Sequence, residues 1–270
     1  TLSAAQMNCV LSQLEQNFNM EYLQEYTVEA GRPDSITREK LEVLYKHHVG
    51  RISINPQTMQ QKTLDLIGRR HTVEATVQAF QMAREIGFDN INMDLIAGLP
   101  EERPEDMADT LRQIEELMPD SLTVHALAMK HGSRLSRERA EAAVRPNYKQ
   151  MAVELEEMIH MAAESARNMG LLPYYLYRQK NIAGNFENVG YAKVDKAGIY
   201  NILIMEEKQS IVAAGAGAST KVVLPYEIPA PGSKNGRKTN LIRIENVRDV
   251  NEYITRIDEM IERKGEWLWR

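Results

Sequence analysis

Residues 83–106 read AREIGFDNINMDLIAGLPEERPED, a stretch in which a helix end, a strand and a helix start follow one another. Gly87 ends an amphipathic helix, the run 91–97 suits a strand, and Pro104 stands where a first helical turn accepts proline. Strands alternate with helices before and after this stretch, and three more strands are predicted at 26–30, 51–55 and 121–127. Strands and helices in this order pair in parallel through right-handed crossovers, so the sequence predicts an α/β fold.

The four predicted strands share one alternation, in which every second residue is apolar and the residues between them are polar. The polar set comprises Thr27, Glu29, Arg51, Ser53, Asn55, Gln57, Asn92, Asp94, Thr123 and His125. Successive side chains of a strand point to opposite faces, so the sheet would have one apolar face for the helices and one polar face. A barrel or half-barrel with a polar lumen satisfies this pattern, and a one-layer sheet with a solvated face is the alternative. Reacting groups of α/β barrels lie at the carboxyl ends of the strands, which singles out Glu29, Gln57, Asp94 and His125.

The sequence changes in character after residue 171. Short β-like runs with Gly-rich turns replace the regular alternation at 174–177, 199–205, 210–214 and 241–244, and a final helix is expected over 250–262. We therefore expect a first domain over residues 1–170 and a smaller α+β region over residues 171–270.

Charge and composition exclude several functional classes. Thirty-three Lys and Arg against 38 Asp and Glu give a net charge of -5, which argues against a general nucleic-acid or polybasic membrane binder. No apolar run approaches the ~20 residues that span a bilayer, and no signal-peptide pattern is present, so we expect a cytoplasmic protein. The single cysteine, Cys9, is expected to be a core thiol, and it excludes a cysteine-built metal site in this chain.

The same stretches resemble the radical S-adenosylmethionine (SAM) enzymes, and more narrowly the oxygen-independent coproporphyrinogen III oxidases, also called coproporphyrinogen dehydrogenases. The resemblance rests on YTVEAGRPDSIT (26–37), GRISINPQTMQQKTLDLIGRRHT (50–72), the stretch 83–106 and SLTVHALA (121–128). PYYLYRQKNIAGNFENVGY (173–191) and IVAAGAGAST (211–220) are similar to the HemZ-like subgroup. The resemblance implies an incomplete radical SAM (β/α) barrel of four parallel strands, followed by a smaller α+β region of coproporphyrinogen dehydrogenase type.

The resemblance also implies a SAM pocket. The family has four such residues in a fixed order: a Glu at the end of one strand, a Gln after the next strand, an Arg, and the Asp of D-L-I-x-G-L-P. In this sequence they correspond to Glu29, Gln57, Arg69 and Asp94. Carboxylates and amides suit the ribose diol and the ammonium group of SAM, and a guanidinium can bind its carboxylate with two hydrogen bonds. Ala128 matches the small residue after the last strand. Gly215 and Gly217 lie in a loop that the family places near the active site, and a tight turn is the alternative interpretation.

The chain departs from the family because it lacks the C-x3-C-x2-C motif that would hold a [4Fe-4S] cluster. The register of the match places two strand–helix units before Thr1, so we expect the C-terminal part of a longer protein, inactive by itself. The resemblance implies that the longer protein takes an electron from a donor and converts two propionates of a tetrapyrrole, coproporphyrinogen III, into vinyl groups. Two alternatives stay open: a non-catalytic haem- or tetrapyrrole-binding relative, and an unrelated α/β-barrel lyase that uses Glu29 and Asp94 as acid and base. No catalytic residue is assigned.

Overall fold

The computed structural model describes residues 2–127, 148–177, 188–230 and 236–269. It divides into two compact units, Thr1–Ile199 and Tyr200–Arg270. This division falls later in the chain than the boundary expected near residue 171, because the strands that follow residue 171 join the sheet of the first unit.

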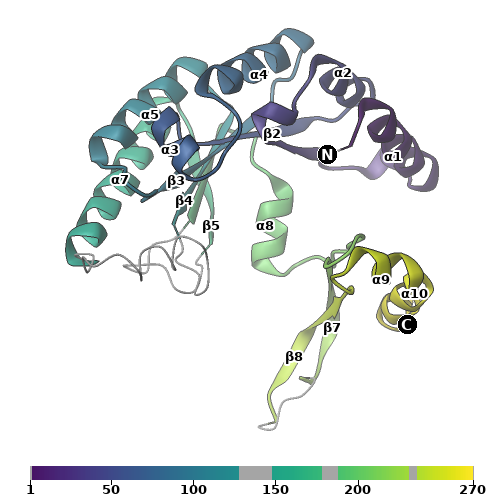
Figure 1. The fold of residues 1–270 in the computed structure, drawn as a ribbon. Helices are drawn as coiled ribbons and strands as arrows, with labels where there is room; N and C mark the ends of the chain where they lie inside the picture. Colours follow the sequence, from purple (N-terminus) through teal and green to yellow (C-terminus); the bar gives the residue numbers. More distant parts are fainter. Residues whose placement is uncertain (1, 128–147, 178–187, 231–235, 270) are drawn as a thin grey trace. The chain divides into compact units, whose positions relative to one another are not determined.

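The first unit contains a six-stranded sheet in the order β1-β2-β3-β4-β6-β5 (Figure 1). Its strands are β1 (Thr27–Gly31), β2 (Arg51–Gln57), β3 (Ile91–Ala97), β4 (Ser121–Ala126), β5 (Leu172–Tyr177) and β6 (Asn188–Ala192). Strands β1 to β4 are parallel, which confirms the predicted α/β fold, whereas β6 runs antiparallel to both β4 and β5.

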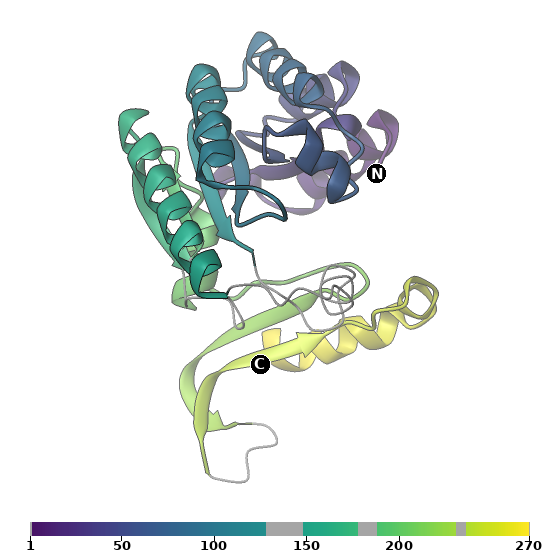
Figure 2. The ribbon, with the colours of Figure 1, turned by 60° about the vertical axis from the view of Figure 1, so that its left-hand side comes forward.

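Helices of the first unit line one face of this sheet. They are α1 (Ala4–Asn17), α2 (Arg38–Lys46), α3 (Gln61–Leu66), α4 (Val73–Ile86), α5 (Pro104–Leu117) and α7 (Tyr148–Asn168), with short 3-10 turns at Met20–Tyr22 and Pro33–Ser35. Figure 1 shows α1, α2, α4, α5 and α7 in an arc along the strands, and Figure 2 shows α5 and α7 side by side. Thr37 and Thr72 cap α2 and α4, and Gly87 ends α4 in the left-handed conformation that glycine tolerates.

The hydrophobic core lies between this arc and the apolar set of strand residues. Its strand members are buried almost completely: Ile52, Ile54, Ile91, Met93, Leu95, Leu122, Val124 and Ala126. They pack with buried helix residues that include Leu41, Leu44, Phe80, Met107, Ile114 and Met158. The polar set of the strands therefore occupies the face turned away from this core.

The second unit is built on a hairpin of β7 (Ser219–Pro229) and β8 (Lys238–Glu245), followed by α9 (Val250–Thr255) and α10 (Ile257–Leu268). The final helix expected over 250–262 is thus two helices. The β-like prediction for 199–205 is wrong, because Ile199–Glu206 forms α8. The carboxylate of Glu25 accepts a hydrogen bond from the backbone N–H of Ile199, and a carboxylate favours helix formation at that end.

Candidate functional site

The register of the four parallel strands aligns the polar side chains in rows. Glu29 lies beside Ser53, and Ser53 lies beside Asn92. Two residues further along β3, Asp94 lies beside Thr123 of β4. All these residues belong to the polar set, so adjacent strands contribute neighbouring groups to one face. The alternation read from the sequence is therefore confirmed for the regular parts of β1 to β4.

Asn92 is the centre of a hydrogen-bond network on this face. Its Nδ2 donates to Asp94 Oδ1 (2.7 Å) and to Ser53 Oγ (3.5 Å), and its Oδ1 accepts from Thr123 Oγ1 (3.2 Å). Asn92 and Ser53 are buried, whereas Asp94 is only half-buried. The amide thus fixes one oxygen of the Asp94 carboxylate, and no hydrogen bond to Oδ2 is found within the described ranges.

Tyr175 extends the network on the same face from β5, the edge strand opposite β1. Tyr175 pairs with Gly190 on β6, and Gly190 pairs with Thr123 on β4. The hydroxyl of Tyr175 shares a hydrogen bond with the side chain of Thr123. Gly190 leaves room for the ring, because a Cβ there would lie 2.0 Å from it. Burial, with smaller contributions from Tyr174 and then from the negative charge of Asp94, raises the pKa of Tyr175 to about 12, so its hydroxyl is neutral.

Sequence reasoning missed Tyr175 as a member of the polar face. The run 174–177 was predicted as β-like, but nothing in it indicates that β6 inserts between β4 and β5. Only the antiparallel pairing of β6 with β4 brings Tyr175 to Thr123.

Gln57 has an irregular backbone at the end of β2. The register shifts between Ile54 and Gln57, so that Gln57 pairs with Leu95 instead of following the regular alternation. Its φ of 72° lies in the left-handed region, which is uncommon for a residue other than glycine. The alternation of side chains along β2 therefore does not determine the face to which the Gln57 side chain points, whereas it does so for the other polar residues of β2.

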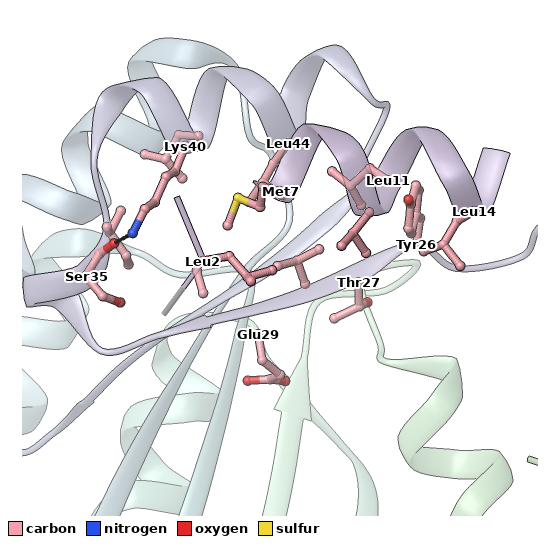
Figure 3. A pocket seen from close by; sticks show the side chains of 15 residues that line it. Leu2, Met7, Leu11, Leu14, Tyr26, Thr27, Glu29, Ser35, Lys40 and Leu44 are labelled. Carbon is pink, nitrogen blue, oxygen red and sulfur yellow. Dashed lines mark hydrogen bonds between the residues drawn. The ribbon is translucent and has the colours of Figure 1, made fainter. Parts of the chain in front are cut away.

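Glu29 is exposed on β1 and is among the residues that line an apolar pocket beside that strand, but its carboxylate points away from the apolar side chains (Figure 3). The pocket has a volume of about 370 Å³ and is lined mainly by side chains of α1, α2 and β1, among them Met7, Leu11, Tyr26 and Leu44. The carboxylate of Glu29 thus belongs to the polar side of the sheet.

The remaining residues predicted from the sequence are not part of the hydrogen-bond network around Asn92 in the described part of the chain. Arg69 follows α3 and is half-buried; its backbone N–H donates to the Leu64 carbonyl (2.8 Å), and its guanidinium has no hydrogen bond or ion pair with another described residue. His125 lies near the carboxyl end of β4 and is half-buried. Ala128 lies outside the described residues.

Gly215 and Gly217 belong to the second unit and form a turn with positive φ angles of 107° and 71°. The N–H of Gly215 donates to the Tyr253 hydroxyl (3.0 Å), and the N–H of Gly217 donates to the Val247 carbonyl (2.7 Å). Both amides therefore have partners within their own unit, which supports the tight-turn interpretation.

The residues present do not fit an iron–sulfur cluster. Cys9 is exposed on α1, outside the apolar stripe that contains Leu11, so its interpretation as a core thiol is wrong. In the part of the chain that the structure describes, no group of three or more His, Cys, Asp or Glu could hold a metal ion. The polar face does fit SAM in the chemistry of its donors and acceptors, since carboxylate, amide and hydroxyl groups are gathered there.

Among the described helices, none has the length and apolar content to cross a membrane.

Comparisons with known proteins give consistent matches. The sequence profile of the radical SAM superfamily matches residues 23–114. The chain is 40% identical over 269 residues to the oxygen-independent coproporphyrinogen-III oxidase-like protein HemZ of Bacillus subtilis, which covers 99% of the chain and 50% of that protein. It is 30% identical over 164 residues to the oxygen-independent coproporphyrinogen III oxidase of Escherichia coli, which covers 61% of the chain and 36% of the oxidase.

A second kind of relative is the heme chaperone HemW of Bacillus subtilis, 38% identical over 104 residues, or 38% of the chain and 25% of the chaperone. The solved structure of coproporphyrinogen III oxidase (HemN) from Escherichia coli matches with a TM-score of 0.66 and 22% identity, over 96% of the chain and 54% of that structure. This structural likeness supports the fold. The chain spans half or less of the length of these curated relatives.

Proposed function

We propose that this chain, which belongs to the radical SAM superfamily, forms part of a SAM-dependent oxidoreductase that acts on a tetrapyrrole. The observation that carries the proposal is the polar face of the first sheet, where Asn92 orients the carboxylate of Asp94. Glu29, Gln57, Arg69 and Asp94 all lie within the span that matches the superfamily. This membership removes the alternative of an unrelated α/β-barrel lyase.

In this proposal the chain's own residues bind and orient SAM. The carboxylates of Glu29 and Asp94 accept hydrogen bonds from hydroxyl or ammonium groups, and the amide of Gln57 can donate and accept. The guanidinium of Arg69 pairs with the SAM carboxylate. SAM held by these residues would supply the 5′-deoxyadenosyl group for radical chemistry in a protein that also holds an iron–sulfur cluster. No ligand of that cluster is assigned to the described residues.

The proposed substrate is coproporphyrinogen III, whose two propionate side chains become vinyl groups. For each propionate, the side chain loses a hydrogen atom to the 5′-deoxyadenosyl radical, and the resulting carbon radical releases CO2 and passes one electron to an external one-electron acceptor, which leaves a vinyl group. The relatives named as coproporphyrinogen III oxidases support this substrate class. The heme chaperone relative supports a second candidate, a protein that binds haem without decarboxylation.

The first experiment measures SAM binding by the intact protein, purified without oxygen and reconstituted with iron and sulfide, by isothermal titration calorimetry. Asp94→Asn should weaken SAM binding at least ~10-fold, because a hydrogen bond to a charged group contributes about 1.5–3 kcal/mol. Asp89→Asn is the matched control: Asp89 is exposed and pairs with Lys196 at the surface. Unchanged affinity in Asp94→Asn would overturn the SAM pocket.

The second experiment separates the two candidate functions. The intact protein is incubated with coproporphyrinogen III, SAM and a chemical reductant, and the porphyrins are oxidised and separated by chromatography. Vinyl products support the oxidoreductase. If no vinyl products form, and if haem added to the same protein in a parallel sample stays bound through gel filtration, the haem-binding protein is supported instead.

A further inference from the structure

Gln57 adopts a conformation that its own sequence does not favour. A left-handed φ in a residue other than glycine persists only where the surrounding structure holds it. The segment 56–60 has anchors on both sides of Gln57, and these anchors come from three other segments of the chain.

His71 is the anchor before Gln57. Its imidazole is only 1% exposed, and Nε2 lies 3.2 Å from the carbonyl oxygen of Pro56. A carbonyl can only accept, so Nε2 carries the proton in this contact. Burial lowers the pKa of His71, and the charges of Arg69 and Arg32 add to this; the hydrogen bond to Pro56 and the charge of Asp34 oppose it without reversing it. The ring is therefore a neutral donor at pH 7, with Nδ1 buried and without a partner in the described part of the chain.

Glu102 is the anchor after Gln57. Its Oε1 accepts a hydrogen bond from Thr58 Oγ1 at 2.6 Å, and the residue is 7% exposed. Thr58 Oγ1 in turn accepts from the backbone N–H of Gln60 (3.2 Å). Burial raises the pKa of Glu102, with Asp106 adding to the rise and the hydroxyl of Thr58 and the charge of Lys62 opposing it.

Thr110 on α5 completes the arrangement. Its Oγ1 accepts from the backbone N–H of Met59 (3.2 Å) and lies 3.3 Å from Thr58 Oγ1. Because the single proton of Thr58 is given to Glu102, the hydroxyl of Thr110 is the donor between the two threonines. The hydrogen bonds of the two threonine hydroxyls are therefore mutually consistent.

We propose that His71 and Glu102 are positioning residues, which hold the backbone on both sides of Gln57 so that its amide is presented to SAM; this inference rests on the proposed function. His71 is two residues after Arg69, and Glu102 follows β3, the strand of Asp94. The two anchors therefore tie the segment of Gln57 to the segments that carry two other candidate SAM residues. Neither side chain is required to touch SAM itself.

The variants are chosen to remove each anchor or to keep it with different chemistry. His71→Phe keeps a ring and removes the donor, whereas His71→Gln supplies an amide N–H in place of Nε2. Glu102→Met removes the acceptor, and Glu102→Gln keeps it. His160→Phe, at an exposed position of α7, is the matched control for the change to phenylalanine.

Two measurements on the intact protein test the proposal. Amide hydrogen exchange should accelerate about tenfold at residues 57–60 in His71→Phe and Glu102→Met, and stay near the wild-type rate in His71→Gln, Glu102→Gln and the control. SAM affinity, measured by calorimetry, should fall about tenfold in the first two variants. In a Gln57→Ala background His71→Phe should cause no further loss, because a residue that acts through the Gln57 side chain has nothing left to position.

Unchanged exchange at 57–60 in both anchor-removing variants would overturn the inference. So would a loss of SAM affinity that adds fully to that of Gln57→Ala, since it would show action by another route. A wild-type protein that fails to bind SAM would overturn the proposed function instead, and the exchange rates would still decide whether the anchors hold this segment.

Discussion

Replacing Asp120 by asparagine should destabilise the first compact unit by about 2 kcal/mol. Asp120 precedes β4 and is 4% exposed. Its Oδ2 lies 2.6 Å from Arg84 Nη1 and accepts the backbone N–H of Ile91 (2.9 Å), and its Oδ1 lies 2.9 Å from Lys193 Nζ. One carboxylate thus links the end of α4, the start of β3 and the end of β6.

The magnitude follows from what asparagine keeps and loses. Breaking a fully buried ion pair costs about 3–5 kcal/mol, whereas an exposed pair contributes less than about 1 kcal/mol. The carboxylate of Asp120 is buried, but the side chains of Arg84 and Lys193 are 29% and 36% exposed, so the cost lies between these limits. Asparagine keeps an oxygen for the N–H of Ile91 and places an NH2 group against one of the two cations.

The same carboxylate gives the prediction a pH dependence. Burial alone would raise the pKa of Asp120, but Arg84, the N–H of Ile91 and Lys193 together hold it below its ordinary value. A lowered pKa in the folded state contributes stability above the unfolded value of about 3.9, and that contribution is lost as the pH falls through the folded pKa. The difference between wild type and Asp120→Asn should therefore be complete at pH 7 and shrink below about pH 4.

The assay is urea unfolding followed by far-UV circular dichroism, which reports the helices around the first sheet. Tryptophan fluorescence is unsuitable, because both tryptophans, Trp267 and Trp269, lie in the second unit. Asp89→Asn, at an exposed pair with Lys196, is the control and should change the free energy of unfolding by less than about 0.5 kcal/mol. A loss below about 0.5 kcal/mol in Asp120→Asn at pH 7, or a loss that is the same at pH 7 and pH 3, would refute the reasoning.

Three further predictions concern the polar face. Gly190→Ala should destabilise the first unit by about 1–3 kcal/mol in the same assay, because the new Cβ would lie 2.0 Å from the Tyr175 ring. Gly50→Ala is the control, because nothing lies within 4 Å of a Cβ at that position. Equal losses of stability in the two variants would contradict the packing argument. In an absorbance titration, Tyr175→Phe should remove a phenol that ionises only near pH 12, and a loss of amplitude near pH 10 would contradict the burial of that hydroxyl. Asn92→Ala should weaken SAM binding by the intact protein about 5-fold, because one hydrogen bond that orients Asp94 contributes about 1 kcal/mol; calorimetry measures this, and unchanged affinity would show that Asp94 needs no such support.

Most of the parallel sheet could be predicted from the sequence, because the patterns that indicate its strands and helices each involve residues close together in the chain. Apolar residues at every second position of β2 and β3 indicate strands that pack on helices along one face, and Thr72 and Gly87 mark the ends of α4. These signals depend on a few neighbouring residues and a fixed period, and the structure confirms them. The prediction of a β-like run at 199–205 is wrong because it too used only local information. The β-branched residues of this run favour a strand, but the run forms α8, and the carboxylate of Glu25 accepts a hydrogen bond from the N–H of Ile199 at the helix start.

The parts of the site that escaped prediction depend on pairing between distant segments. Tyr175 reaches Thr123 only because β6 inserts between β4 and β5 and because Gly190 has no side chain there. Counting alternate residues from Arg51 predicts that Gln57 lies on the polar face, but the register shift between Ile54 and Gln57 makes that count invalid at the end of β2. What marks Gln57 instead is its left-handed backbone, which is flanked by the contact of His71 with Pro56 and that of Glu102 with Thr58, and no period in the sequence encodes these contacts. A sequence motif can thus identify a site residue, whereas the orientation of that residue depends on the buried side chains that hold the backbone around it.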